Sequence, residues 1–320
     1  MKITKVNYKD QWFDLTDSNG NAQNFIVITG ESGVGKTDML RVIRNYHNVA
    51  GLYEYEGEEG LDSKLPFIDV EDYQLYDCDL EGLNVDKVNA MVADFCLNVR
   101  LDSIRLIPKT EVDWHIIKND LEADVIFKTH SGKEIRIISL SNSERRIYTQ
   151  AIIFCKYQPK NTVILIDEPE TSLHPSLQSK VANMYRMMQK NGDNQIIMTT
   201  NSPQIVSCFD AKNVFRLQND ENGEFECVSM YKKCVHTRGC EPNDLIEDVF
   251  KTPLRDFDTI QRIKEVFGIF ETHPDKANEP ENKKLIESLI SDLGENDAIV
   301  MHIEHELSII ESEKKTNENI

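Results

Sequence analysis

Residues 30–37 read Gly-Glu-Ser-Gly-Val-Gly-Lys-Thr and fit the phosphate-binding pattern G-x-x-x-x-G-K-[ST]. The stretch before them, Phe25-Ile-Val-Ile-Thr29, is short and β-branched, as in a buried strand. Apolar residues with helical spacing follow from Lys36 to Asn48. Glycines at such a turn let successive backbone N–H groups point inward around a phosphate. A strand, a glycine-rich turn and a helix in this order predict a phosphate-binding loop.

The residue types within this loop suggest how it would hold a nucleotide. Lys36 is expected to neutralise the β- and γ-phosphates, and the Thr37 hydroxyl is expected to ligate Mg²⁺. The helix that follows would point its N-terminus at the anion. The expected nucleotide-binding residues are Gly30, Glu31, Ser32, Gly33, Val34, Gly35, Lys36, Thr37 and Asp38.

A second apolar strand ends in two acids. Val163-Ile-Leu-Ile166 is followed directly by Asp167 and Glu168. Asp167, at the strand tip, is expected to hold the Mg²⁺ shell, and Glu168 is expected to polarise the attacking water as a catalytic residue beside Lys36. Such acid pairs often cap a helix, and this pair predicts a nucleotide site only because a phosphate-binding loop precedes it in the chain.

Strands and helices alternate along most of the chain, which predicts an α/β fold. The strands among helices are fully apolar, which indicates a parallel sheet covered on both faces. Residues 1–235 are assigned to this α/β head, and residues 236–320 to an acidic C-terminal helical segment broken at Pro253, Pro274 and Pro280. Strands are predicted at 1–8, 11–15, 25–29, 161–166, 195–200 and 214–217, a hairpin over 123–139, and helices over 84–99, 143–156 and 177–190.

Composition excludes several classes of protein. The 320 residues carry a net charge of −19, so the chain is not a protein coated in basic residues for nucleic acid. Apolar runs stay well short of the roughly 18 residues of a membrane span, and the N-terminus lacks the apolar region of a signal peptide. A cytoplasmic protein without a membrane partner is expected. The seven cysteines form no Cys-x-x-Cys pair, which favours reduced thiols over a disulfide frame or a zinc site.

Three segments resemble motifs of the ABC-type ATPases related to SMC, RecF and the OLD nucleases. Ile166-Asp-Glu-Pro-Glu-Thr-Ser-Leu-His-Pro175 looks like the Walker B motif and D-loop of that group. Leu140-Ser-Asn-Ser-Glu144 is similar to the signature Leu-Ser-x-Gly-Glu, and Ile197-Met-Thr-Thr-Asn-Ser-Pro-Gln204 to a switch segment that usually contains Thr-His-Ser-Pro-Gln. The motifs follow the family's order over about residues 1–220.

This resemblance implies an ATPase that uses ATP and Mg²⁺ and closes into an ATP-sandwich dimer, as a homodimer or a higher oligomer. In the family, the signature of one subunit contacts the γ-phosphate held by the other. Here that role would fall to Ser141 and to the backbone near Ser143, at the N-terminus of a helix. Asn201 would stand at the catalytic switch position, and Gln74 is the candidate for the Q-loop ligand of Mg²⁺.

Two residues depart from the family pattern. Asn201 replaces the switch histidine, and its amide can hydrogen-bond a γ-phosphate or a water but cannot change charge near neutral pH. Ser143 replaces the signature glycine and adds a Cβ where a phosphate would approach the backbone. Slow hydrolysis, or a switch gated by nucleotide, is expected from these two changes.

The spacing of the motifs limits what else the chain can contain. Only about 100 residues separate Thr37 from the signature, too few for the coiled coil of SMC proteins, so a short helical lid is expected near residues 60–120. The segment after residue 220 does not fit the TOPRIM nuclease domain of the OLD proteins.

The C-terminal segment carries a second resemblance. Gly239-Cys-Glu-Pro-Asn-Asp-Leu-Ile-Glu-Asp-Val-Phe250 and Leu293-Gly-Glu-Asn-Asp297 look like the tail of small bacterial SMC-like ATPases of Septu-type and retron-associated antiphage systems. That resemblance implies an ATPase that regulates a separately encoded effector, a nuclease or a toxin. A solvated acidic appendage is the simpler interpretation of the same segment.

Two other functions stay open, a nucleotide-binding assembly scaffold with negligible hydrolysis and a DNA-repair ATPase. DNA is therefore kept as a partner to be tested, although many acids surround the cations in question. The candidate DNA contacts are Arg100, Arg105, Lys109, Lys118 and Lys128.

Overall fold

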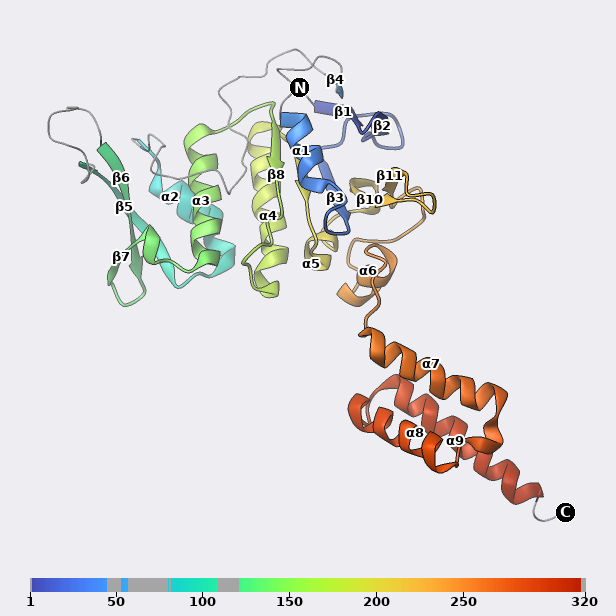
Figure 1. Ribbon diagram of the computed structural model, residues 1–320. Helices are drawn as coiled ribbons and strands as arrows, with labels where there is room; N and C mark the ends of the chain where they lie inside the picture. The colour runs from blue at the N-terminus through green and yellow to red at the C-terminus, as the bar shows by residue number, and fades with distance from the viewer. Residues whose placement is uncertain (1, 45–52, 57–79, 81, 109–120, 318–320) are drawn as a thin grey trace. The chain divides into compact units, whose positions relative to one another are not determined.

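The computed structural model describes residues 2–44, 53–56, 80, 82–108 and 121–317, and it divides the chain into two compact units. The larger unit is Met1–Lys251 and the smaller is Thr252–Ile320 (Figure 1). Composition places the boundary at residue 235. In the structure the first unit continues to residue 251, because helix α6 (Pro242–Asp248) and the residue that follows it bury Leu245 and Val249 in the first unit's core.

A five-stranded sheet forms the centre of the larger unit, in the order β11-β10-β3-β9-β8. The four strands from β10 to β8 are parallel, and β11 pairs antiparallel with β10. The predicted parallel strands are confirmed, and the edge strand β11, which the sequence reading missed, makes the sheet mixed. The strands are β3 (Phe25–Gly30), β8 (Val163–Ile166), β9 (Gln195–Thr199), β10 (Val214–Asn219) and β11 (Phe225–Ser229).

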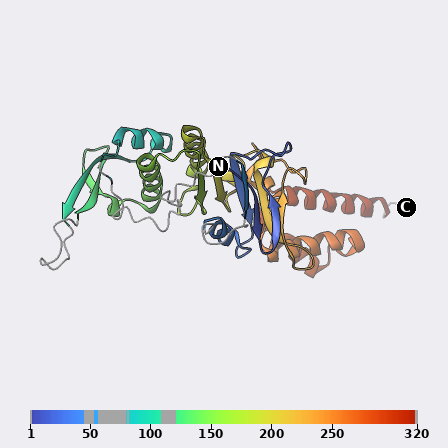
Figure 2. The same cartoon turned by 90° about the horizontal axis from the view of Figure 1, so that it is seen from above.

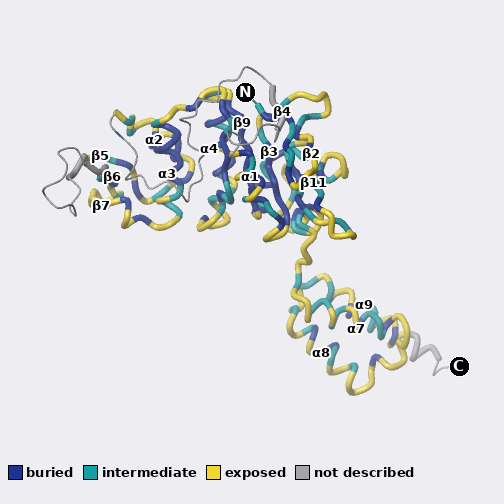
Figure 3. Tube along the Cα trace, turned by 45° about the horizontal axis from the view of Figure 1, so that its top comes forward, coloured by how far each residue is buried: buried dark blue, intermediate teal, exposed yellow. Residues whose placement is uncertain are grey.

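Alternate side chains of these strands feed two separate cores, one on each face of the sheet. In β9, Ile197 packs in one core, while Ile196 and Met198 pack in the other. The first core also contains side chains of β1 (Lys2–Tyr8), β2 (Gln11–Asp14) and α1 (Lys36–Arg44); the second contains those of α3 (Asn142–Tyr157) and α4 (Pro175–Gly192). Figure 3 shows β3 and β9 in dark blue along most of their length. Coverage of both faces explains why these strands read as continuous apolar runs.

Two smaller antiparallel sheets flank the central one. The first has the order β2-β1-β4, with β4 at Tyr53–Glu56 and a two-residue turn, Lys9-Asp10, joining β1 to β2. The second has the order β5-β6-β7, with β5 at Val99–Pro108, β6 at Leu121–Thr129 and β7 at Glu134–Arg136. Strands β6 and β7 confirm the predicted hairpin.

The expected helical lid is helical only in part. Residues 57–79 and 109–120 of that segment lie outside the described residues. Helix α2 (Val85–Val92) and the 3₁₀ turn η3 (Ala93–Phe95) follow the prediction, but the chain then turns at Cys96, which has φ of +52°, and enters strand β5. Apolar and polar side chains alternate over residues 99–102 and again over residues 103–106, with a shift of register between the two runs, so that one face of the strand can pack against the protein. The sequence reading passed over this alternation.

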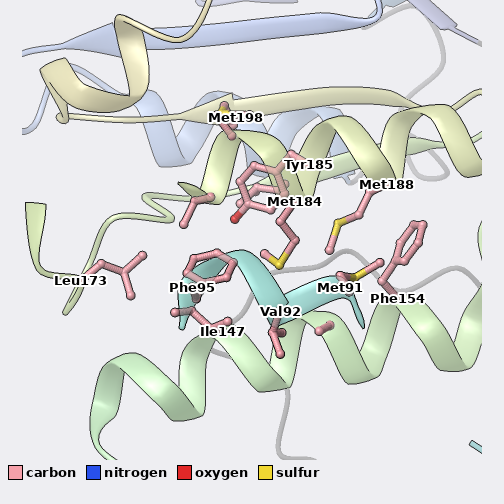
Figure 4. Packing of buried hydrophobic residues seen from close by; sticks show 14 of the residues in the cluster. Met91, Val92, Phe95, Ile147, Phe154, Leu173, Met184, Tyr185, Met188 and Met198 are labelled. Carbon is pink, nitrogen blue, oxygen red and sulfur yellow. The ribbon is translucent and has the colours of Figure 1, made fainter. Parts of the chain in front are cut away.

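Helix α2 packs against α3 and α4, and with α3 it lies between the β5-β6-β7 sheet and α4 (Figures 1 and 2). Side chains rich in methionine fill this contact, among them Met91, Met184 and Met188 (Figure 4). The buried hydroxyl of Tyr148 on α3 donates a 2.8 Å hydrogen bond to the carbonyl of Val99 on β5. The signature helix α3 is therefore held from both sides.

The smaller unit is a bundle of three helices, α7 (Phe257–Thr272), α8 (Pro280–Leu293) and α9 (Ala298–Asn317). Its core includes Val266, Leu289 and Ile303, each fully buried. A 2.8 Å ion pair joins Arg255 to Asp297 ahead of α9, and hydrogen bonds from Arg255 lower the pKa of Asp297. The remaining short elements of the chain are η4 (Ile137–Ser139), α5 (Pro203–Val206), η5 (Ala211–Asn213) and η6 (Pro274–Lys276).

Membrane insertion finds no support among the helices of the described residues. Each of them is too short or too polar to cross a bilayer.

One buried side chain ties the central sheet to the β1 sheet. The Gln195 amide donates to the carbonyls of Ile3 (2.9 Å) and Gln23 (2.8 Å), and its oxygen accepts from the Ile3 backbone N–H (2.7 Å). Gln195 is fully buried, so water cannot replace these bonds.

Replacing Gln195 with leucine should lower the free energy of unfolding of the larger unit by about 3 kcal/mol or more, because it leaves three buried backbone groups unpaired. Urea unfolding followed by circular dichroism measures the change. Gln11→Leu, on the exposed surface of β2, is the matched control and should change stability by about 0.5 kcal/mol at most. Equal stability of the two variants would contradict the structural role of Gln195.

Candidate functional site

The phosphate-binding loop leaves the C-terminal end of β3, and α1 begins at Lys36, as the sequence predicts. Two glycines are required by close approach of neighbouring atoms. Gly30 has φ of +147°, and a Cβ there would lie 2.3 Å from the backbone oxygen of Leu217. Gly35 has φ of +111°, and a Cβ there would lie 2.4 Å from the hydroxyl of Tyr8. The loop therefore keeps its shape only with glycine at both positions.

Lys36 lies at the centre of the loop and is 5% exposed. Its ammonium group donates to the backbone oxygens of Gly30 (2.8 Å) and Glu31 (3.1 Å). Burial lowers the pKa of Lys36, while the charges of Glu168, Glu170 and Asp167 act to raise it. The lysine of the loop and the acids that follow β8 thus share one site.

Asp167 joins three segments of the chain. One carboxylate oxygen accepts a 2.7 Å hydrogen bond from the Thr37 hydroxyl, and the other accepts from the hydroxyl of Thr199 at the end of β9. The same Thr199 hydroxyl accepts from the backbone N–H of Glu168 at 3.1 Å. Because parallel strands end on the same edge of a sheet, residues far apart in sequence meet here.

Asn201 and Glu168 are also brought together. The Asn201 amide donates to the Glu168 carboxylate at 2.7 Å. Glu168 has φ of +40°, so the backbone turns sharply after β8. Arg146 of α3 donates to the carbonyls of both Asp167 (3.1 Å) and Glu168 (2.8 Å) and stabilises this turn. The expected base and the expected switch residue are therefore in direct contact.

The signature residues lie apart from this cluster. Ser141 caps α3 in a capping box with Glu144, whose carboxylate accepts from the Ser141 hydroxyl at 2.7 Å. The Ser143 hydroxyl donates to the carbonyl of Ser172, in the D-loop that runs from Thr171 to His174. The structure therefore pairs Ser141 and Ser143 with their own helix and D-loop rather than with the phosphate-binding loop of the same chain.

Several residues of the site were missed in the sequence. Thr199 lies inside the switch segment, and a hydroxyl at the end of an apolar strand could have indicated a residue of the site. Tyr8 gave no signal: its hydroxyl donates to Asp38 at 2.8 Å, and burial raises its pKa. Asp38, expected to contact nucleotide, is thus engaged by Tyr8. The contacts of Arg146 depend on the folded arrangement alone.

The oxygen donors of the site fit a magnesium ion. Mg²⁺ is usually held by one or two protein oxygens together with substrate phosphates and waters. Thr37 and Asp167 supply such oxygens within hydrogen-bond distance of each other. Gln74, the third expected ligand, lies outside the described residues. Among the residues that are described, clusters of three or more His, Cys, Asp or Glu that could bind a metal by themselves do not occur.

The candidate DNA contacts are already paired where the structure describes them. Each of the three described cations lies on or beside the β5-β6-β7 sheet and contacts a carboxylate of the same region. Lys109 and Lys118 lie outside the described residues. The pairs are Arg100–Asp86 (3.2 Å), Arg105–Glu134 (3.2 Å) and Lys128–Asp102 (3.0 Å).

Residues 93–207 match the family described as "AAA domain, putative AbiEii toxin, Type IV TA system". The match includes the signature, the acids after β8 and the whole switch segment, and the phosphate-binding loop precedes it. No curated protein matches the chain.

Three solved structures illustrate the similarity to SMC heads. The SMC head bound to the C-winged helix domain of ScpA has a TM-score of 0.46 and 13% identity, over 73% of this chain and 99% of that one. The SMC head domain from Thermotoga maritima has a TM-score of 0.42 and 12% identity, over 72% and 99%. A structure from a study of ATP-driven dimerization and DNA stimulated activation of SMC ATPases has a TM-score of 0.34 and 17% identity, over 47% and 86%.

The half-buried Glu170 predicts a measurable pH dependence. Burial raises its pKa despite hydrogen bonds from Asn201 and Thr200 that lower it. A carboxyl with a raised pKa in the folded state stabilises the fold below its unfolded pKa, and this contribution is lost as pH rises through the folded pKa. From about pH 4 to pH 7, Glu170→Gln should therefore lose less stability than the unmodified chain. Urea unfolding at both pH values checks this, with the exposed Glu224→Gln as control; parallel pH profiles of all three proteins would contradict it.

The phosphate-binding loop and the acids that face it lie in the larger unit, which also contains the residues that match the AAA family model. These features support an ATP-binding ATPase domain.

Proposed function

We propose that the chain binds ATP with Mg²⁺, hydrolyses it slowly and closes into an ATP-sandwich dimer that regulates a partner effector. The observation that carries this proposal is the contact of Thr37 and Thr199 with the two oxygens of Asp167, beside the contact of Asn201 with Glu168. A phosphate-binding loop and a candidate base thus lie at the same edge of the central sheet.

Residues of the loop would bind the nucleotide. Lys36 would exchange its bonds to two loop carbonyls for contacts to the β- and γ-phosphates. The N–H groups of residues 31–38 would add hydrogen bonds at the N-terminus of α1. Thr37 and Asp167 would hold Mg²⁺, which when bound supplies positive charge to the phosphates.

Glu168 and Asn201 would act on the water. Glu168 would accept its proton, while the Asn201 amide holds the carboxylate in place. Because an amide does not ionise near neutral pH, Asn201 cannot add the positive charge that a histidine could place near the γ-phosphate. This difference supports slow turnover.

The exposed signature supports a dimer. Ser141 and Asn142 are exposed at the N-terminus of α3, where their side chains hydrogen-bond to Glu144 and Arg145 of the same turn of helix. A second copy could offer this helix N-terminus to the γ-phosphate of the first. The two ATP sites would then be complete only in the closed dimer.

The regulation of a separate effector is supported by the family description and by the charge of the C-terminal residues. The family description that matches residues 93–207 refers to a toxin and to a toxin–antitoxin system. Residues 241–320 hold 20 Asp and Glu against 9 Lys and Arg, a charge that would suit a basic protein surface. We infer that a separately encoded nuclease or toxin is regulated by this ATPase, in the cytoplasm and in antiphage defence.

A scaffold with negligible hydrolysis is the second candidate, because Asn201 and Ser143 both depart from the pattern of active family members. A DNA-repair ATPase has less support, since the three described candidate contacts, Arg100, Arg105 and Lys128, are each paired with a carboxylate. DNA binding that weakens steeply with added salt would favour the DNA-repair ATPase again.

Glu168→Gln should trap the closed dimer, because the variant binds ATP but lacks the carboxylate that accepts the proton. Light scattering should show a mass of 36.9 kDa doubling on addition of Mg-ATP. Lys36→Ala should stay at the starting mass, because it loses the cation that binds the phosphates. Glu224→Gln removes an exposed carboxylate that contacts none of the proposed catalytic residues, and it should behave as the unmodified chain.

Two other results would count against the proposal. A mass unchanged by ATP, with nucleotide shown to be bound to Glu168→Gln, would favour a constitutive scaffold. Hydrolysis by Glu168→Gln at the rate of the unmodified chain would remove Glu168 from the mechanism.

A further inference from the structure

The carboxylate of Glu170 accepts two hydrogen bonds from the switch segment (residues 197–204). One of its oxygens accepts a 2.9 Å hydrogen bond from the Thr200 hydroxyl, and the other accepts from the backbone N–H of Asn201. These are two consecutive residues of the switch segment, and both bonds end on one side chain. The backbone at Asn201 is therefore fixed by Glu170.

This position decides where the Asn201 side chain lies. Asn201 is exposed, and its amide reaches the Glu168 carboxylate at 2.7 Å. Asn201 thus contacts Glu168 through its side chain and Glu170 through its backbone N–H. Without Glu170, Asn201 itself would be joined to the candidate base by one hydrogen bond of an exposed side chain.

Glu170 also links the switch segment to the D-loop. It is the residue before Thr171, and its backbone oxygen accepts from the N–H of Leu173 at 2.8 Å within the D-loop turn. On the far side of the switch segment, Ser202 donates to Gln178 at 2.6 Å, and Gln178 donates to the carbonyl of Leu173 at 3.0 Å. The D-loop and the switch segment thus form one hydrogen-bonded unit.

The position of the Glu170 carboxylate is unfavourable for its charged form. Burial removes water from the carboxylate, and the nearby charge of Glu168 repels it. A buried carboxylate usually has a paired cation or several hydrogen bonds. Here the bonds come from the switch segment, so the energy of these bonds is tied to the switch conformation.

We propose that Glu170 is a positioning residue, which holds Asn201 against Glu168. The effect of Glu170 on the hydrolysis rate rests on the proposed function. The contacts of Glu170 with Thr200 and Asn201 do not, because they are formed within the chain without nucleotide.

The test is a double-mutant cycle with Glu170→Ala, Asn201→Ala and the double variant, with Glu224→Gln as the carboxylate control. Single-turnover ATP hydrolysis and ATP affinity are measured for each. If Glu170 acts through Asn201, each single variant lowers the hydrolysis rate about tenfold at nearly unchanged ATP affinity. The double variant then falls no further than Asn201→Ala alone, because the effects are not additive.

A purely structural role predicts a different pattern. Glu170→Ala would then lower the rate by the same factor in both backgrounds, and that result would overturn the proposal. Glu170→Gln, which keeps one acceptor oxygen, guards against loss of folding and should give an intermediate rate.

Hydrogen–deuterium exchange without nucleotide separates this inference from the proposed function. Glu170→Ala and Glu170→Gln should increase deuterium uptake in peptides over residues 197–207, whereas Glu224→Gln should not. Unchanged uptake there overturns the positioning role whatever the enzyme activity. Increased uptake in a chain that binds ATP but never hydrolyses it retains the contact and rejects hydrolysis as its purpose.

Discussion

The site depends on one carboxylate. Both oxygens of Asp167 accept hydrogen bonds from threonine hydroxyls, one at the start of α1 and one at the end of β9. Thr37 and Asp167 are 130 positions apart in the sequence, and the parallel pairing of β8, β9 and β3 brings them together. A carboxylate shared in this way fixes the phosphate-binding loop, the candidate base and the switch segment relative to one another.

The sheet can hold Asp167 there only in one register. Ile164 and Ile166 of β8 enter one core, and Leu165 enters the other. A shift by one residue would exchange these faces and turn every side chain of the strand over. Because both cores are filled, such a shift would cost apolar contacts on two faces at once. Packing far from the edge of the sheet therefore determines where Asp167 and Glu168 point.

Much of this arrangement is readable in the sequence, because the relevant strands are apolar on both faces and end in motif residues. The phosphate-binding loop, β8 with its acids and the signature helix were all predicted where the structure has them. Strand β11 is an edge strand of mixed polarity, and β5 was hidden in a segment expected to be helical. Both gave only weak alternation of polar and apolar residues.

The contacts within the site were harder to predict than the elements that carry them. Glu170 and Asn201 are 31 positions apart, and nothing in their local spacing links an acid after a strand to the backbone of a later loop. Arg146 lies on a helix whose apolar spacing predicts which face is buried. That spacing does not predict that Arg146 donates to the carbonyls of Asp167 and Glu168. Such contacts arise when elements meet, so they follow from tertiary structure rather than from periodicity. Gln74 stays a prediction.

The charges of the site give the proposed function a further requirement. Asp167, Glu168 and Glu170 all act on Lys36, so three carboxylates face one buried ammonium group. A nucleoside triphosphate would bring several more negative charges to the same place and add to the repulsion. The phosphate-binding loop offers N–H groups and a single lysine against this. A metal-free nucleotide would therefore be a poor ligand, and the position of Asp167 beside Thr37 makes best sense if nucleotide and divalent cation arrive together.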